Sequence, residues 1–179
     1  MTQEIIMAGA GGDGIMLIGQ LLAYAAVVED KNVVWFPSYG PESRGGPADC
    51  TVIISEEEIG SPITASPDTL IVLNQLQLDK YAPSVKSEGL IILNSSLAAP
   101  PSDRSDCRII SIPASDIATA LGTARATNMV MLGCYVAAAQ PVTLSSILKS
   151  LPEVLPPHRH NLLPVNEAAL ERGAGLARQ

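Results

Sequence analysis

Cysteine is scarce in this sequence. The chain has three cysteines among 179 residues, and Cys50, Cys107 and Cys134 stand far apart. None belongs to a Cys-x-x-Cys pair, so we expect no disulfide scaffold, no zinc site and no locally bound iron–sulfur cluster. Cys50 and Cys134 lie in apolar runs and are predicted to be core residues. A reducing cytoplasm is the compartment that fits this cysteine usage best.

Charged residues are also few. They make up 16% of the chain, well below the ~25% of ordinary soluble domains. The formal net charge of −7 disfavours nucleic-acid binding, which needs surfaces rich in lysine and arginine. Hydrophobic residues reach 47%. This balance indicates that a partner covers part of the apolar surface, and a large alanine-rich core is the alternative explanation.

Long apolar runs are absent. The sequence has no uninterrupted apolar stretch of about 18 residues, so we expect no membrane span. The N-terminal segment MTQEIIMAGAGGDG has neither the basic region nor the long apolar stretch of a signal peptide. We therefore expect a cytoplasmic protein. A chain of 179 residues suits one domain and can bury roughly 70% of its unfolded surface.

What the sequence does contain is an alternation of strand-like and helix-like segments. The predicted strands are Glu4–Met7, Val33–Pro37, Asp49–Ser55, Thr69–Asn74, Gly89–Ser95 and Arg108–Ile112. The predicted helices are Ile15–Val28, Gln75–Tyr81, Ser115–Leu121, Thr127–Ala139, Ser145–Leu151 and Asn166–Ala177. Ser115, Thr143 and Asn166 are the predicted N-caps.

This alternation predicts an α/β fold. We expect a three-layer, Rossmann-like open sheet that is largely parallel, with helices on both faces. The apolar centre of the strand at Gly89–Ser95 suits a parallel strand buried on both sides. One domain is predicted over residues 1–179, in which residues 155–179 form a C-terminal irregular segment and a final helix. His158 and His160 have no third ligand close in sequence, so we expect no metal site there.

A glycine loop follows the first predicted strand. Its members are Gly9, Gly11, Gly12, Asp13 and Gly14. The G-x-G-x-x-G spacing is typical of dinucleotide sites, but the second strand ends in WFPS, without the acidic residue that binds the ribose. Asp13 would also face a bound pyrophosphate, and like charges ~4 Å apart repel by about 4 kcal/mol at an effective dielectric constant of ~20. Three roles remain open: tight turning and close packing, contact with a ligand or partner, and NAD(P) or FAD binding.

The second glycine-rich stretch is the SYGPESRGGP loop, residues 38–47. Its prolines fix φ, whereas its glycines allow conformations that other residues avoid. Arg44 could hold a carboxylate or phosphate through two parallel hydrogen bonds. The alternative is a surface turn with an exposed Glu42–Arg44 ion pair, worth ~0–1 kcal/mol. The residues predicted to face a substrate or partner are Ser38, Tyr39, Gly40, Pro41, Glu42, Arg44, Gly45 and Gly46.

Together these motifs resemble the gamma subunit, or gamma domain, of 2-oxoacid:ferredoxin oxidoreductases. The matching stretches are GAGGDGI at 9–15, SYGPESRGG at 38–46, DCTVIIS at 49–55, IGSP at 59–62 and NMVMLG at 128–133. The resemblance covers most of residues 4–140. One departure is Asp13, where the family usually has glutamine. The SYGPE form of the loop is most similar to the 2-oxoglutarate branch.

The resemblance implies an enzyme complex that converts a 2-oxoacid and coenzyme A to an acyl-CoA and carbon dioxide, with ferredoxin as the electron acceptor. It implies thiamine diphosphate and magnesium on alpha and beta subunits, and iron–sulfur clusters on the beta and a ferredoxin-like subunit. This chain is then expected to bind none of these cofactors, to carry no catalytic residue and to be inactive alone.

The resemblance also implies roles for the second loop. Residues 38–46 would face the alpha or beta subunit near the thiamine site, where Arg44 binds an anionic group and Tyr39 and Glu42 position it. Two alternatives stay open: a scaffold or assembly protein without a role at the active site, and a free-standing nucleotide-binding enzyme. Self-association of the isolated chain through an uncovered apolar surface is also open.

Overall fold

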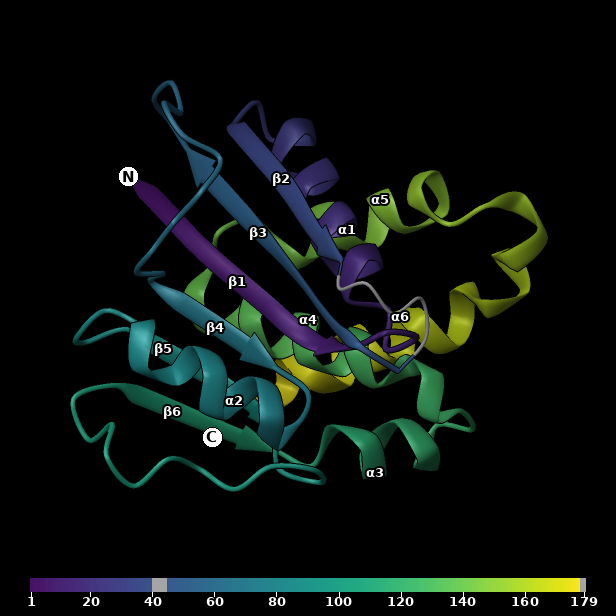
Figure 1. Cartoon of the computed structure of the whole chain (residues 1–179). Helices are drawn as coiled ribbons and strands as arrows, with labels where there is room; N and C mark the ends of the chain where they lie inside the picture. Colours follow the sequence, from purple (N-terminus) through teal and green to yellow (C-terminus); the bar gives the residue numbers. More distant parts are fainter. Residues whose placement is uncertain (40–44, 178–179) are drawn as a thin grey trace.

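One six-stranded sheet forms the centre of the molecule in this computed structural model, which describes residues 1–39 and 45–177 (Figure 1). The strands are β1 (Thr2–Ala10), β2 (Asn32–Tyr39), β3 (Pro47–Ser55), β4 (Thr69–Val72), β5 (Leu90–Asn94) and β6 (Arg108–Ile112). The helices are α1 (Ile15–Val28), α2 (Gln75–Tyr81), α3 (Ala114–Ala120), α4 (Thr127–Ala139), α5 (Leu144–Val154) and α6 (Leu163–Leu176). Three short 3₁₀ helices are η1 (Ala82–Ser84), η2 (Ala124–Ala126) and η3 (Pro157–Leu162).

The strand order is β2-β3-β1-β4-β5-β6. Strands β1, β4, β5 and β6 pair in parallel, whereas β3 runs antiparallel to both of its neighbours, β1 and β2. The predicted open, largely parallel sheet is therefore confirmed. The antiparallel strand follows from the short connection at residues 40–46, because a parallel crossover needs about a dozen residues or more.

Helices cover both faces of the sheet, as predicted, but unequally. Alternate side chains of β1 show the division, since successive residues of a strand point to opposite faces. Ile5 and Met7 join the large core shared with α1, α3, α4, α5 and α6, whereas Ile6 and Ala8 join a smaller core under α2. All five residues of β5 are buried, which confirms the prediction of a strand covered on both sides.

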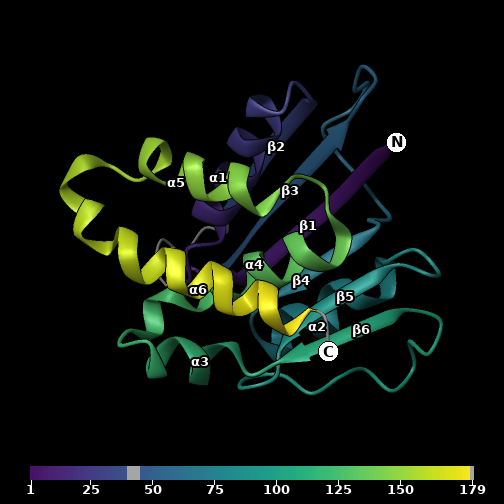
Figure 2. The ribbon, with the colours of Figure 1, turned by 180° about the vertical axis from the view of Figure 1, so that it is seen from behind.

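Helix α4 lies at the centre of the larger core. Residues 127–136 are all buried, as expected for a helix that is apolar on most sides. The last helix, α6, packs across it (Figure 2). At this crossing the two backbones touch through glycines: a Cβ atom on Gly133 would collide with the Leu170 carbonyl, and one on Gly173 with the Val130 carbonyl. The absence of two side chains thus sets the distance between α4 and α6.

Several predicted boundaries need correction. Helix α3 begins at Ala114 after Pro113, so Ser115 is not its N-cap. Helix α6 begins at Leu163, because Pro164 suits a first helical turn, where its missing N–H is not needed. Asn166 therefore lies inside that helix, and the preceding segment, predicted as irregular, contains η3. The Thr143 cap is confirmed, since its hydroxyl accepts a hydrogen bond from the Ser146 N–H at 3.1 Å.

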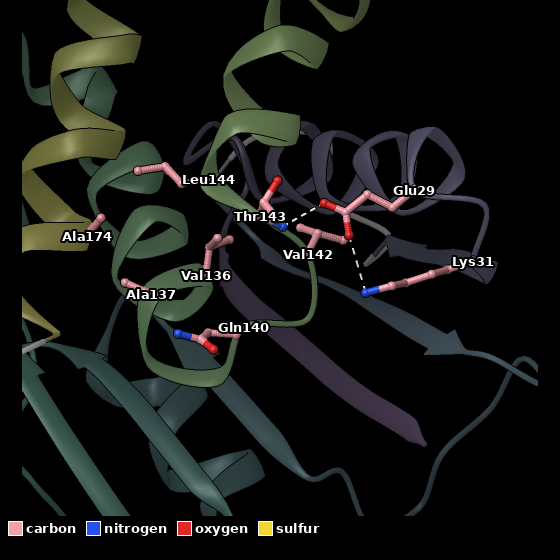
Figure 3. Close-up of a pocket in the computed structure, with 9 residues that line it drawn as sticks. All are labelled: Glu29, Lys31, Val136, Ala137, Gln140, Val142, Thr143, Leu144 and Ala174. Atoms are coloured by element: carbon pink, nitrogen blue, oxygen red, sulfur yellow. Dashed lines mark hydrogen bonds and ion pairs between the residues drawn. The ribbon is translucent and has the colours of Figure 1, made fainter.

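A single carboxylate joins α5 to the end of α1. The Thr143 backbone N–H donates to Glu29 at 2.7 Å, and the Lys31 ammonium lies 3.3 Å from the same carboxylate, beside a cavity of about 450 Å³ (Figure 3). Burial alone would raise the pKa of Glu29, but hydrogen bonds from Thr143, Ser146 and Lys31 outweigh it and lower the pKa to about 2. The charged groups beside this cavity are therefore already bound to each other.

We predict that Glu29→Gln lowers the free energy of unfolding near pH 7 by about 1–2 kcal/mol, because the carboxylate bound at the start of α5 is lost. Since folding lowers the pKa from 4.5 to about 2, this stability is fully present above pH 4.5 and is lost as the pH falls toward 2. Urea unfolding between pH 7 and pH 2 measures it. The exposed Glu167→Gln is the control, and identical pH profiles for both variants would contradict the prediction.

We also predict that Gly173→Ala destabilises the protein by about 3 kcal/mol, because the new methyl group must push α6 away from α4. Gly175→Ala is the matched control on the same helix, since a Cβ atom there meets no atom within 4 Å. That change should be neutral or stabilise by up to about 0.5 kcal/mol. Thermal and urea unfolding of both variants compare them, and equal effects would refute the close-crossing explanation.

Candidate functional site

The ends of the parallel strands mark the candidate site. Strands β1, β4, β5 and β6 end at the same edge of the sheet (Figure 1). After β1 the chain continues through α1 to β2, at one end of the strand order. After β4 it continues through α2 to β5, in the opposite direction along the sheet. In open α/β sheets, ligands bind outside the carboxyl ends of the strands at such a switch point. The glycine loop follows β1 at this position.

Within the glycine loop, Asp13 closes its own turn. Its carboxylate accepts a hydrogen bond from the Ala10 N–H at 2.8 Å, while the Asp13 N–H donates to the Ala10 carbonyl at 3.0 Å. Asp13 does not cap α1, because the N-cap is Gly14 and no side chain caps this helix. Gly12 and Gly14 adopt φ values of 102° and 75°, which glycine reaches at little cost.

Asn128 fastens the glycine loop to α4. Its amide nitrogen donates to the Gly14 carbonyl at 3.1 Å, and the side chain is 3% exposed. A Cβ atom on Gly14 would collide with this amide, so the close approach needs glycine in addition to the positive φ. The stretches 9–15 and 128–133, which share in the family resemblance, are thus in direct contact. This role of Asn128 was not predicted from the sequence.

The glycine loop also binds the end of the SYGPESRGGP loop. The Gly11 N–H donates to the Gly46 carbonyl at 2.7 Å, and the Gly45 N–H donates to the Gly11 carbonyl at 3.4 Å. The strand register agrees, since Ala10 pairs with Pro47. Gly45, with a φ of 74°, needs the conformational freedom of glycine. The two predicted loops therefore form one connected element, and exposed Ser38 lies at the other base of the second loop.

The remaining residues of the second loop lie outside the described structure. These are Gly40, Pro41, Glu42, Ser43 and Arg44, together with the side chain of Tyr39. The predicted anion-binding role of Arg44 and the positioning roles of Tyr39 and Glu42 stay predictions. The structure establishes where the loop is attached, because β2 ends at Tyr39 and β3 begins at Pro47.

A buried asparagine holds neighbouring strand ends together. Asn94 ends β5 and is fully buried; its amide nitrogen donates to the Leu73 carbonyl at 3.2 Å and bonds the Ser115 hydroxyl at 2.9 Å. Its oxygen accepts from the Ser96 and Ser115 N–H groups. This network joins the end of β5 to the residue after β4 and to the first turn of α3. Its sequence signal is a single amide at the end of an apolar strand, which by itself does not show what the amide bonds.

Two cavities open along this edge. One, of about 280 Å³, lies between the glycine loop and the ends of β4 and β5. The other, of about 530 Å³, lies between the glycine loop, the start of α4 and the start of α6. Exposed leucines stand nearby: Leu97 lines the smaller cavity, and Leu76 is in the first turn of α2. Cavities beside exposed apolar side chains are typical of binding surfaces.

The cysteines do not resemble metal ligands. Burial raises the pKa of the Cys50 thiol to about 12 and that of Cys134 to about 11, so both stay protonated at neutral pH. Both are buried, as predicted. In the part of the chain that the structure describes, no group of three or more His, Cys, Asp or Glu side chains could hold a metal ion. Within that same part, no helix has the length and apolar character needed to cross a membrane.

Comparison with known proteins gives consistent results. Residues 4–176 match the family described as "Pyruvate ferredoxin/flavodoxin oxidoreductase". The chain is 38% identical to ketoisovalerate oxidoreductase subunit VorA of Methanothermobacter thermautotrophicus, over 98% of this chain and 36% of that relative. It is 35% identical to 2-oxoglutarate synthase subunit KorC of Methanocaldococcus jannaschii, over 87% of this chain and 85% of that relative. It thus spans about a third of VorA and most of KorC.

The fold agrees with a solved structure. The gamma subunit of the keto/oxoacid ferredoxin oxidoreductase from Geobacter sulfurreducens superposes with a TM-score of 0.86 and 29% identity, over 99% of this chain and 97% of that one. Its match extends over all six strands and over α6, beyond the stretches that carried the sequence resemblance. The chain therefore belongs to the pyruvate ferredoxin/flavodoxin oxidoreductase family, and within it corresponds to the gamma subunit of 2-oxoacid:ferredoxin oxidoreductases.

Proposed function

We propose that this chain is the gamma component of a 2-oxoacid:ferredoxin oxidoreductase complex and works with alpha and beta chains that bind thiamine diphosphate and magnesium. A ferredoxin-like chain and the beta chain would carry the iron–sulfur clusters. The observation that supports this most directly is the hydrogen-bonded contact between Gly11 and Gly46, because it joins the two motifs of the family resemblance at the edge where α/β sheets bind ligands.

The contribution of this chain would be to shape and hold the entrance to the active site. Two backbone hydrogen bonds anchor residues 45–46 to the glycine loop, which Asn128 in turn fastens to α4. These contacts hold the base of the loop at the carboxyl edge of the sheet, where a partner chain could reach residues 38–44. In the proposed complex it lies against the alpha or beta chain, beside the path by which the 2-oxoacid or coenzyme A enters.

Arg44 would bind an anionic group there, either the carboxylate of the 2-oxoacid or an acidic residue of the partner. A guanidinium group holds a carboxylate through two parallel hydrogen bonds, so it orients the group as well as attracting it. The first substrate to assay is 2-oxoglutarate, because the SYGPE form of the loop is most similar to that branch. Relatives carry the names of different 2-oxoacids, so the assay should also include ketoisovalerate and pyruvate.

The composition of the complex is tested first. A tagged copy of the full chain, purified from its native extract without oxygen, should retain thiamine-binding and cluster-binding chains, identified by mass spectrometry. The eluate should reduce a viologen dye only when both a 2-oxoacid and coenzyme A are present. A chain that elutes alone and inactive, under conditions that preserve such complexes, would refute the proposed function.

We predict that Arg44→Ala in the intact complex raises KM for the anionic substrate by about tenfold or more, because one bidentate, charge-assisted interaction is lost. Steady-state kinetics of the purified complex measure this. Arg44→Lys should restore only part of the affinity, since lysine cannot bind in two places at once. The control is Arg108→Ala, an exposed arginine at the start of β6.

The alternative roles of the loop give different results. Loss of the partner chains from Arg44→Ala during purification would mean that Arg44 binds a partner's acidic group. An assembled complex with unchanged KM and turnover would contradict any role of Arg44 at the active site and would support the scaffold alternative. Bound flavin or nicotinamide in the purified chain, detected by absorbance, would favour the nucleotide-binding alternative.

A further inference from the structure

The outer face of α1 is apolar and uncharged. The helix contains no acidic or basic residue, although the chain has 18 acidic and 11 basic ones. Tyr24, Val27 and Val28 are 41%, 58% and 51% exposed, and they are three of the eight large apolar side chains that are exposed among the described residues. Single exposed apolar side chains are ordinary, whereas a group of them on one helix indicates an interaction surface.

The spacing of these residues suits contact with another helix. Leu17, Gln20, Tyr24 and Val27 follow one another at intervals of three, four and three residues, so they form one row along the helix, called here the α1 row. Gln20 is exposed and Leu17 is partly buried. The opposite side of α1 faces the larger core through buried residues, which include Ile18, Leu21, Leu22 and Ala25. Side chains in such rows pack into the grooves of a facing helix.

The neighbouring strand does not favour extension of the sheet. Strand β2 lies beside α1 and is the outermost strand at this end of the sheet (Figure 2). Pro37 of β2 has no N–H to donate, and proline in a strand interrupts pairing along an edge. A partner at this end of the molecule is therefore expected to contact the side chains of α1 rather than to add a strand.

The α1 row is complementary to a reversed copy of itself. If a second α1 runs antiparallel about a two-fold axis, Leu17 lies opposite Val27 and Gln20 lies opposite Tyr24, and each contact occurs twice. The apolar side chains then meet at the two ends of the row. The amide of Gln20 meets the hydroxyl of Tyr24, and these groups can form a hydrogen bond. The row thus supplies both halves of its own partner.

Opposite charges meet in the same register. Asp13 precedes α1 and Lys31 follows it, at equal distances from the middle of the row, so Asp13 of one copy comes beside Lys31 of the other. Lys31 already contacts Glu29, but an ammonium group has three donors. Exposed Asp30 would lie near the start of the second α1, where no side chain caps the helix and a negative charge is favourable. Charge therefore favours a second copy in this orientation.

We propose that α1 is a homodimer interface, at which two copies of this chain pack their α1 rows antiparallel about a two-fold axis. This inference identifies a surface for the self-association that the sequence left open. A contact centred on one pair of helices is smaller than the ~1,600 Å² of a standard interface. The dimer should therefore be weak, with a Kd on the order of 10–100 µM. The proposal concerns the isolated chain and does not depend on the complex.

The test is sedimentation equilibrium of the purified full chain between about 1 µM and 1 mM. The wild type should form dimers in this range. Val27→Arg should raise the Kd at least about tenfold, because a charge is pressed against apolar Leu17 of the second copy. Tyr24→Ala should raise it similarly, because ring contacts and a hydrogen bond are lost. Ile63→Arg is the matched control, since Ile63 is 68% exposed and lies outside α1.

Cross-linking tests the register. In a Cys107→Ser background, Gln20→Cys chains mixed with Tyr24→Cys chains should form a disulfide between copies on mild oxidation, because these positions face each other. Val27→Cys alone should not, since its two copies lie about 15 Å apart along the helix axes. The other two cysteines are buried, so they should not react.

Three results would overturn the proposal. One is a chain that stays monomeric up to about 1 mM. Another is a dimer that neither Val27→Arg nor Tyr24→Ala weakens while both variants keep the melting temperature of the wild type, as expected for exposed positions. The third is a monomeric chain whose Val27→Arg variant loses other chains of the complex, because α1 would then bind a different partner. Failure of the complex to co-purify would leave the sedimentation results unaffected.

Discussion

The backbone contact between Gly11 and residues 45–46 is the constraint on which the candidate site depends. It positions the base of the second loop directly beside the end of β1, and the Asn128 amide extends the same connection to the buried helix α4. Each contact requires a missing side chain: Gly14 leaves room for Asn128, and Gly45 takes a left-handed backbone conformation. The glycines thus act together, because the contacts at Gly11 and at Gly14 hold the same loop between β3 and α4.

Much of the fold follows from local sequence patterns. The predicted bounds of α1, α2, α4 and β6 agree with the structure, since apolar periodicity, caps and flanking loops all indicate the same limits. Helix α6 begins at Leu163 rather than at Asn166, because Pro164 lies in the first helical turn, where proline is common, and does not end the preceding segment. The insertion of β3 between β1 and β2 depends on pairing between distant segments, which periodicity alone does not reveal.

The candidate site was predictable only in part, because it also depends on pairing between distant segments. The two loops were recognisable as motifs, but their hydrogen bonds to each other come from strand register. Asn94 and Asn128 are both buried amides, yet they differ in what they bind, namely the strand ends and the glycine loop. Nothing in the residue type separates these cases. Only the tertiary surroundings show which backbone groups each amide bonds.

The packing of α4 beneath α6 has a consequence for synthesis of the chain. Helix α4 is buried on all sides only when α6 lies over it, and α6 follows α4 in the chain and is therefore synthesised later. Until then an almost wholly apolar helix remains partly uncovered, and exposed surfaces of this kind favour aggregation of nascent chains. The larger core can therefore close only after α6 has left the ribosome, so the nascent chain passes through a stage in which a chaperone or an assembly partner can protect it.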